Sequence, residues 1–182
     1  DRAFLPIKKN TAIQDVEFLP GFKLFMRFSD QFYPDVISSE TSSGEKTYYD
    51  AAYGKESQDH VLGLLSTGIS AQEYYLLGNS DSIVSSVIQE LDGYFNGLAS
   101  QNYLGSYIYE DWGQHTFTQG TWTSDFEKSA IKLNDSLDDK VYFAGETYNT
   151  HGITPNRGFY IIRGSVQSAI LSGYDVVEQI LE

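Results

Sequence analysis

Residues 22–28 have the sequence Phe-Lys-Leu-Phe-Met-Arg-Phe, and their alternation predicts a β-strand. Because successive side chains of a strand point to opposite faces, odd-numbered and even-numbered positions would lie on different sides of a sheet. The first face carries Lys23, Phe25 and Arg27, and the second carries Leu24, Met26 and Phe28. The stretch therefore predicts a strand with one basic, aromatic face and one apolar face.

The segments beside this strand predict further strands and turns. Residues 15–19 alternate polar and apolar side chains, as a strand does, and Pro20-Gly21 breaks the run. Residues 38–45, Ser-Ser-Glu-Thr-Ser-Ser-Gly-Glu, are polar throughout and predict a loop. Further strands are expected at residues 47–53, 60–66 and 103–109.

Residues 79–95 predict an amphipathic helix with defined ends. Asn79 or Ser80 can cap its N-terminus, and Asp81 lies in the first turn, where a negative charge is favourable. Asn96-Gly97 stops it. Apolar residues recur at helical spacing, and the stripe consists of Ile83, Val84, Val87, Ile88, Leu91 and Phe95.

The last forty residues predict a strand, a loop and a helix. Residues 141–144 are a short apolar run, residues 147–163 are a long loop, and residues 164–181 form the closing helix. Its expected buried stripe is Val166, Ala169, Ile170, Gly173, Val177, Ile180 and Leu181. A strand-rich front and a strand–helix tail together predict an α+β fold.

Composition narrows the classes of function. The 182 residues carry a net charge of −13, which repels phosphate backbones and argues against nucleic acid as a partner. No apolar run is long enough to span a bilayer, so no membrane partner is expected. The chain has no Cys, and His60, His115 and His151 lack the spacing of metal ligands, so no metal site is expected.

The tail carries the most specific pattern in the chain. Phe143-Ala144-Gly145-Glu146 leads through the loop to residues 164–173, Gly-Ser-Val-Gln-Ser-Ala-Ile-Leu-Ser-Gly. This resembles the C-terminal flavin signature of the flavin amine oxidase superfamily, which includes monoamine, polyamine and L-amino acid oxidases and flavin-type histone demethylases. The resemblance implies FAD as cofactor, with Gly145 approaching it closely and Glu146 binding its ribityl or ribose hydroxyls. It also implies that the helix start directs N–H groups to the flavin ring, through Gly164, Ser165, Val166 and Ala169.

Two more segments resemble the same family in the same order. Residues 112–122 resemble its Trp…Gly-x-aromatic stretch, which implies that Trp112 flanks the flavin and that Trp122 forms a wall of the substrate cage. The second cage aromatic would fall at Ser165, so the cage is expected to be open on one side. Residues 23–34 resemble the strand with the family's active-site lysine, which implies that Lys23 is catalytic and holds a water against flavin N5.

The resemblance covers residues 4–181 but departs from the family pattern at two informative places. Thr121 stands where monoamine oxidases have the Cys that binds FAD covalently, so noncovalent FAD is expected. The dinucleotide-binding fingerprint is absent, which implies that an N-terminal portion of the protein is a partner of this chain. Residues 1–120 would then belong to a mixed-sheet substrate-binding domain, and residues 121–182 would close a Rossmann-like FAD-binding domain.

The function implied is oxidation of a small-molecule amine to an imine by hydride transfer to flavin N5, with O2 as the expected acceptor. Two alternatives stay open, a related FAD-dependent desaturase or isomerase and a cofactor-free binding module on the same scaffold. The identity of the amine, the oligomeric state (a homodimer included) and the compartment stay open too. So do the roles of Asn149, His151 and Arg157 in the long loop.

Overall fold

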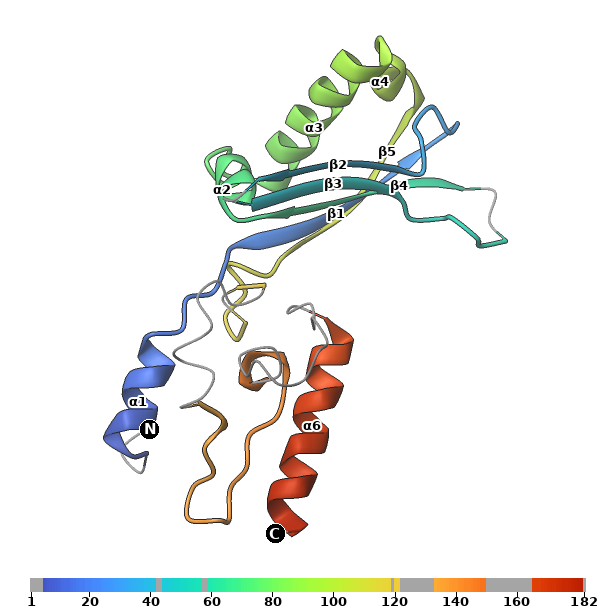
Figure 1. The fold of residues 1–182 in the computed structure, drawn as a ribbon. Coiled ribbons are helices and arrows are strands. Elements are labelled where there is room, and N and C mark those ends of the chain that lie inside the picture. The colour runs from blue at the N-terminus through green and yellow to red at the C-terminus, as the bar shows by residue number, and fades with distance from the viewer. Residues whose placement is uncertain are drawn as a thin grey trace. The chain divides into compact units, whose positions relative to one another are not determined.

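The computed structural model describes residues 5–41, 44–56, 59–118, 120–121, 133–149 and 165–181, with only the backbone described at 39–41. The chain divides into two compact units (Figure 1). Leu19–Thr121 forms the first, called the sheet unit here, and Asp1–Phe18 with Trp122–Glu182 forms the second, called the terminal unit. Residues 1–18 thus group with the C-terminal part, although they were predicted to belong with residues 19–120. The roles assigned to the two parts stay predictions.

The sheet unit is built on one antiparallel sheet of five strands in the order β2-β3-β4-β1-β5. The strands are β1 (Gly21–Phe28), β2 (Val36–Thr41), β3 (Gly44–Asp50), β4 (His60–Thr67) and β5 (Tyr103–Asp111). The predicted β1 is confirmed, and it pairs with β4 on one side and β5 on the other. Its two faces are as expected: Leu24, Met26 and Phe28 are buried, while Lys23 and Arg27 are exposed.

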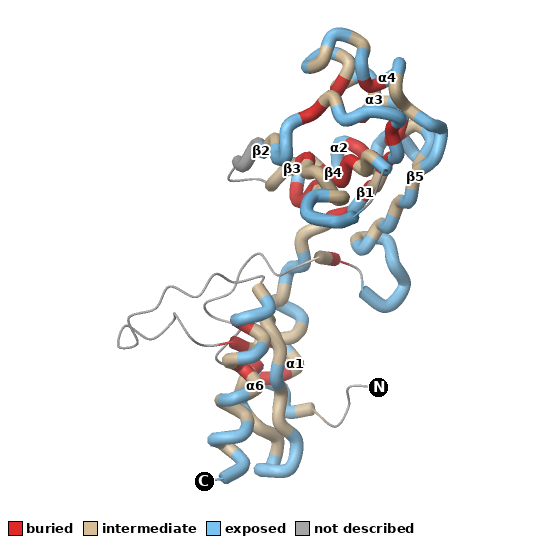
Figure 2. The backbone as a smooth tube through the Cα atoms, turned by 90° about the vertical axis from the view of Figure 1, so that its right-hand side faces the viewer, coloured by how far each residue is buried: buried red, intermediate tan, exposed pale blue. Residues whose placement is uncertain are grey.

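Three helices lie over the apolar face of this sheet: α2 (Ile69–Tyr75), α3 (Ser80–Phe95) and α4 (Leu98–Asn102) (Figure 1). The predicted α3 and its ends are confirmed. The Asn79 side chain accepts a hydrogen bond from the Ser82 amide, and Asn96 takes the left-handed conformation that ends a helix. The stripe residues Ile83, Val84, Val87 and Leu91 are buried in the core beneath it. Figure 2 marks the buried residues of the chain in red.

Three of the local predictions were wrong. Residues 38–41 and 44–45 of the predicted loop instead lie in the paired strands β2 and β3, because backbone pairing and the 2.8 Å bond between the Ser38 and Thr47 hydroxyls need no apolar face. Residues 15–19 form no strand, since the unpredicted helix α1 (Ile7–Gln14) reaches Asp15 as its C-cap. In place of a strand at residues 141–144, only an isolated bridge joins Leu137 and Val141.

The terminal unit contains α1, the single turn η1 (Glu146–Tyr148) and α6 (Val166–Leu181). The predicted helix is confirmed over these bounds, but its buried side is not the expected one. Buried side chains on α6 are Ser168 and Ser172. The larger members of the expected stripe are 51–80% exposed, and they are Val166, Ile170, Val177, Ile180 and Leu181. Among the described residues, no helix has the length and apolar character needed to cross a membrane.

Candidate functional site

Lys23 lies on the sheet face opposite α2, α3 and α4, called the lysine face here. Its backbone pairs with Leu65 of β4 and Glu110 of β5. Because alternate residues of β1 share a face, Phe25 and Arg27 lie on it as well. Arg27 is occupied by an exposed ion pair with Asp59, 2.6 Å away. The exposed ammonium of Lys23 therefore stands at the opposite end of β1 from this ion pair.

Aromatic side chains cover the middle of the lysine face. A Cβ at Gly63 would lie 2.5 Å from Cζ of Tyr49, so the absence of a side chain on β4 lets the tyrosine ring rest on the strand. The rings of Phe25 and Tyr49 meet edge to face with centroids 6.3 Å apart. Burial raises the pKa of Tyr49. Ile108, opposite Phe25 on β5, is 70% exposed, so apolar surface continues across the sheet from β3 to β5.

The loop after β5 begins beside the lysine end of β1. Asp111 pairs with Phe22, and its carboxylate accepts hydrogen bonds from Tyr75 (2.7 Å), Tyr109 (3.3 Å) and Gln114 (2.8 Å). Burial, followed by the bond to Asp111, raises the pKa of Tyr75. Trp112 comes next and is 39% exposed. The predicted residues Lys23 and Trp112 are therefore brought to the same end of the sheet.

The same loop returns to the first residue of β1. The backbone N–H and the hydroxyl of Thr121 both donate to the Leu19 carbonyl, at 2.9 Å each. Gly21 leaves space for the Thr121 side chain, because a Cβ there would overlap its Cγ2 atom. Thr121 is thus fixed against Gly21, which precedes Lys23 by two residues. Trp122, the predicted wall of the substrate cage, lies outside the described residues.

In the terminal unit, Gly145 and Glu146 are held against α6. Gly145 has φ of +138°, a conformation that favours glycine, and its N–H donates to the Ser172 hydroxyl at 3.1 Å. Glu146 begins the η1 turn and is partly buried. The glycine at position 145 therefore permits the backbone conformation from which the turn of Glu146 begins.

A second polar bond fixes the segment after Glu146. Asn149 is 1% exposed, and its Nδ2 donates to the Ser168 hydroxyl at 2.6 Å. Ser168 and Ser172 are one turn apart, so residues 145–149 run along α6 toward its N-terminal end. No role was predicted for Asn149, and neither serine was singled out within the stretch 164–173. The spacing of two small polar residues on an apolar helix was the available signal.

The N-terminal end of α6 carries the other predicted flavin contacts. The Ser165 hydroxyl accepts from the Ser168 amide at 3.2 Å, and the Ala169 amide donates to the Ser165 carbonyl at 3.3 Å. Ser165 therefore caps the helix, and Val166 is exposed in its first turn. First-turn amides of a helix lack partners within it and favour negative charge. Gly164, His151 and Arg157 lie outside the described residues.

A comparison with known protein families shows to which family the chain with these residues belongs. A family model described as flavin containing amine oxidoreductase matches residues 2–181. The chain belongs to this family. Membership implies a flavin cofactor and a general oxidoreductase role, and the α+β architecture agrees with it. No curated protein matches the chain.

The described residues fit a flavin. A flavin needs hydrogen-bond acceptors for its ribityl or ribose hydroxyls and hydrogen-bond donors for the electron-rich edge of its ring. Glu146 supplies a carboxylate on a turn fixed by Gly145, and the α6 N-terminus supplies amides next to Ser165. The nearest side-chain atom to a Cβ placed at Gly145 would be Cδ2 of Tyr148, at 3.5 Å.

Proposed function

We propose that the chain is the substrate-binding and flavin-closing part of an FAD-dependent amine oxidase. The observation that supports this best is the placement of Lys23. It is an exposed cation at the end of an aromatic sheet face, two residues from the Gly21–Thr121 contact that fixes the predicted cage segment. A surface lysine with a purely structural role would need neither the aromatic surface nor the nearby Gly21–Thr121 contact.

The proposed division of labour follows from the side chains. The bound flavin would supply the redox chemistry, taking up the hydride lost by the amine-bearing carbon. Lys23 would hold a water by a charge-assisted hydrogen bond at the place where the hydride is transferred. Phe25 and Tyr49 would cover the substrate carbon skeleton and keep bulk water away from it. Loss of a proton from the nitrogen to solvent would leave an imine, and O2 would take up the two electrons with two protons and leave as hydrogen peroxide.

Noncovalent attachment of FAD is proposed from Thr121. Its hydroxyl is engaged with the Leu19 carbonyl, and the chain contains no thiol that could form a thioether with the cofactor. Glu146, Ser165 and the first-turn amide of Val166 would hold the flavin by hydrogen bonds alone, because the Ala169 amide is already bonded to the Ser165 carbonyl.

A second function has support from the lysine face. Its apolar stretch through Phe25, Tyr49 and Ile108 would also suit a substrate without an amine, as in a related FAD-dependent desaturase or isomerase. The cationic Lys23 at the end of this surface favours the oxidase. A cofactor-free binding module is the remaining alternative.

The spectrum of the intact protein separates these candidates. We expect flavin absorbance that bleaches when an amine from a panel of alkyl and aryl amines is added without oxygen, and returns on aeration. We expect acid precipitation to release all flavin into the supernatant. A colourless protein supports the binding module, and a yellow protein that no amine bleaches supports the desaturase or isomerase. Flavin retained on a peptide of this chain contradicts noncovalent binding.

A further inference from the structure

Lys9 of α1 is a buried cation. It is 4% exposed, although the neighbouring Lys8 on the same helix is exposed. Burying an ammonium group costs several kcal/mol unless its donors are satisfied. Burial lowers the pKa of Lys9, and the negative charge of Asp135 partly offsets this effect. The contacts of the buried Lys9 ammonium must therefore compensate for the cost of its burial.

The Lys9 ammonium is satisfied by one loop of the terminal unit. It donates to the Leu133 carbonyl at 2.8 Å and to the Asp135 carbonyl, and it lies over the Phe143 ring, 3.5 Å from the centroid. An ammonium has three N–H donors, and two carbonyls and a ring face match that number. Lys9 therefore ties both ends of residues 133–143 to α1.

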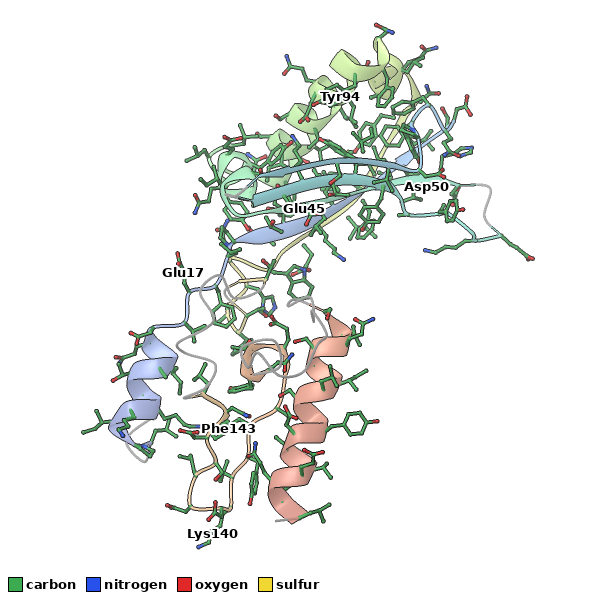
Figure 3. The ribbon with its side chains drawn as sticks, viewed as in Figure 1. Glu17, Glu45, Asp50, Tyr94, Lys140 and Phe143 are labelled. Atoms are coloured by element: carbon green, nitrogen blue, oxygen red, sulfur yellow. The ribbon has the colours of Figure 1, made fainter. Side chains whose placement is uncertain are left out.

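The Phe143 ring connects this cation to the flavin-contacting turn. Its other neighbour is the Tyr148 ring, with centroids 5.7 Å apart and planes inclined by 30°. Phe143 precedes Gly145 by two residues, and Tyr148 ends the η1 turn that Glu146 begins. The stacked side chains of Lys9, Phe143 and Tyr148 thus hold the residues on both sides of the Gly145–Glu146 turn. Phe143 is labelled in Figure 3.

The turn is held from its other side by α6. Gly145 donates to Ser172, and Asn149 donates to Ser168, so the segment is fixed between α1 and α6. The α6 contacts fix the backbone amide of Gly145 and the side chain of Asn149. The α1 contact fixes the residues that lead into the turn, and it depends on one charged side chain.

We propose that Lys9 is a positioning residue for flavin binding, which holds the Gly145–Glu146 turn in place through the two carbonyls and the Phe143–Tyr148 ring pair. This inference rests on the proposed function, since it assumes that the turn contacts the cofactor. Lys9 itself touches neither flavin nor substrate in this account. Its effect on the cofactor passes through residues 143–148.

The test is a flavin titration of the intact protein. Apoprotein is titrated with FAD, and the dissociation constant is taken from the quenching of flavin fluorescence. We expect Lys9→Met to raise the dissociation constant about tenfold or more, as the loss of hydrogen bonds from a charged group would. Lys8→Met, on the same helix, should leave it unchanged. Lys9→Arg should recover part of the loss, because a guanidinium can reach two carbonyls and stack on a ring.

A double-mutant cycle shows whether Lys9 acts through the turn. If it does, Lys9→Met and Glu146→Gln together should weaken FAD binding by less than the product of their separate effects. A purely structural lysine would lower the unfolding temperature of the apoprotein while FAD binding to the folded fraction stayed at the wild-type value. That result overturns the proposal, as does a fully multiplicative cycle.

The remaining outcomes of these experiments are decisive too. If Lys9→Met does not fold, Phe143→Leu keeps the carbonyl bonds and removes the ring, and it should still raise the FAD dissociation constant. An unchanged constant in that variant overturns the proposal. Wild-type protein that binds no FAD overturns the proposed function and this inference with it. Wild-type binding with Lys9→Met equal to wild type overturns the inference alone.

Discussion

Helices α3 and α6 have the same length, and each carries an apolar stripe, but the structure uses the two stripes differently. On α3 the apolar residues are buried, among them Val87 and Leu91, which are 0% exposed. On α6 the apolar residues Ile170 and Tyr174 are mostly exposed, and the buried positions are Ser168 and Ser172. Amphipathic spacing predicted both helices, but it predicted the buried side of only one.

The difference separates two kinds of stability. The sheet unit buries the apolar side of α3 against its own strands, so its core is made within Leu19–Thr121. The terminal unit also depends on specific polar contacts, through Lys9, Asn149 and the two α6 serines. Area burial therefore stabilises the first unit, and directed hydrogen bonds have a larger share in the second.

The largest expected effect contrasts two truncations in the 182-residue chain. Leu91→Ala on α3 should lower the free energy of unfolding by about 2–5 kcal/mol, because it opens a cavity in the core. Ile170→Ala on α6 removes an exposed side chain and should change it by less than about 0.5 kcal/mol. Urea unfolding followed by circular dichroism measures both. Equal losses would mean that the α6 stripe is covered in solution and that the contrast between the units is wrong.

A smaller effect is expected from a polar truncation. Ser172→Ala leaves the Gly145 amide without its acceptor and should cost about 1–3 kcal/mol in the terminal unit. Ser85→Ala on the exposed side of α3 removes a hydroxyl that bonds to its own helix, and it should cost less than about 0.5 kcal/mol. Amide hydrogen exchange at α6 and α3 reports the two units separately. A Ser172→Ala protein with unchanged exchange at α6 would argue against a polar anchor.

The smallest expected effect is a pH dependence confined to the sheet unit. Burial, with the nearby Tyr74 and Glu90, raises the pKa of Tyr48, and burial also raises that of Tyr74, from ordinary values of 10.0. Above pH 10 the unfolded chain loses these protons while the folded unit keeps them, so the stability present below that pH should fall as pH rises. Tyr48→Phe should weaken this loss in urea unfolding at a series of pH values. An undiminished loss would point to other groups.

The extent of sequence-based prediction follows the same division. Strand β1 and helix α3 were predicted because each buries its apolar side within the unit that contains it. The β2–β3 hairpin was missed because its polar residues pair through backbone and hydroxyl groups. The apolar stripe of α6 was predicted to be buried, but it is exposed. Helical periodicity shows that a stripe exists and does not show whether another part of the same unit covers it.

The candidate site shows a similar limit. The family resemblance singled out Lys23, Trp112, Gly145 and Glu146, and the structure describes where each of them lies. It could not single out Lys9, whose partner Leu133 is 124 positions away in the sequence. The Asn149–Ser168 bond was missed as well, although the one-turn spacing of Ser168 and Ser172 on an apolar helix was a signal on the serine side.

The central claim is that Lys23 takes part in amine oxidation at the flavin, and the two half-reactions of the intact enzyme test it most directly. Lys23→Met keeps the length of the side chain and removes its donor, so FAD content and thermal stability should survive. Stopped-flow absorbance should show flavin reduction by amine, or reoxidation by O2, slowed about 10²–10³-fold, as when a positioned donor is removed. Arg27→Met, on the same face of β1, should leave both rates unchanged. Wild-type rates for both half-reactions in Lys23→Met would contradict the account and make Lys23 a structural residue of the sheet.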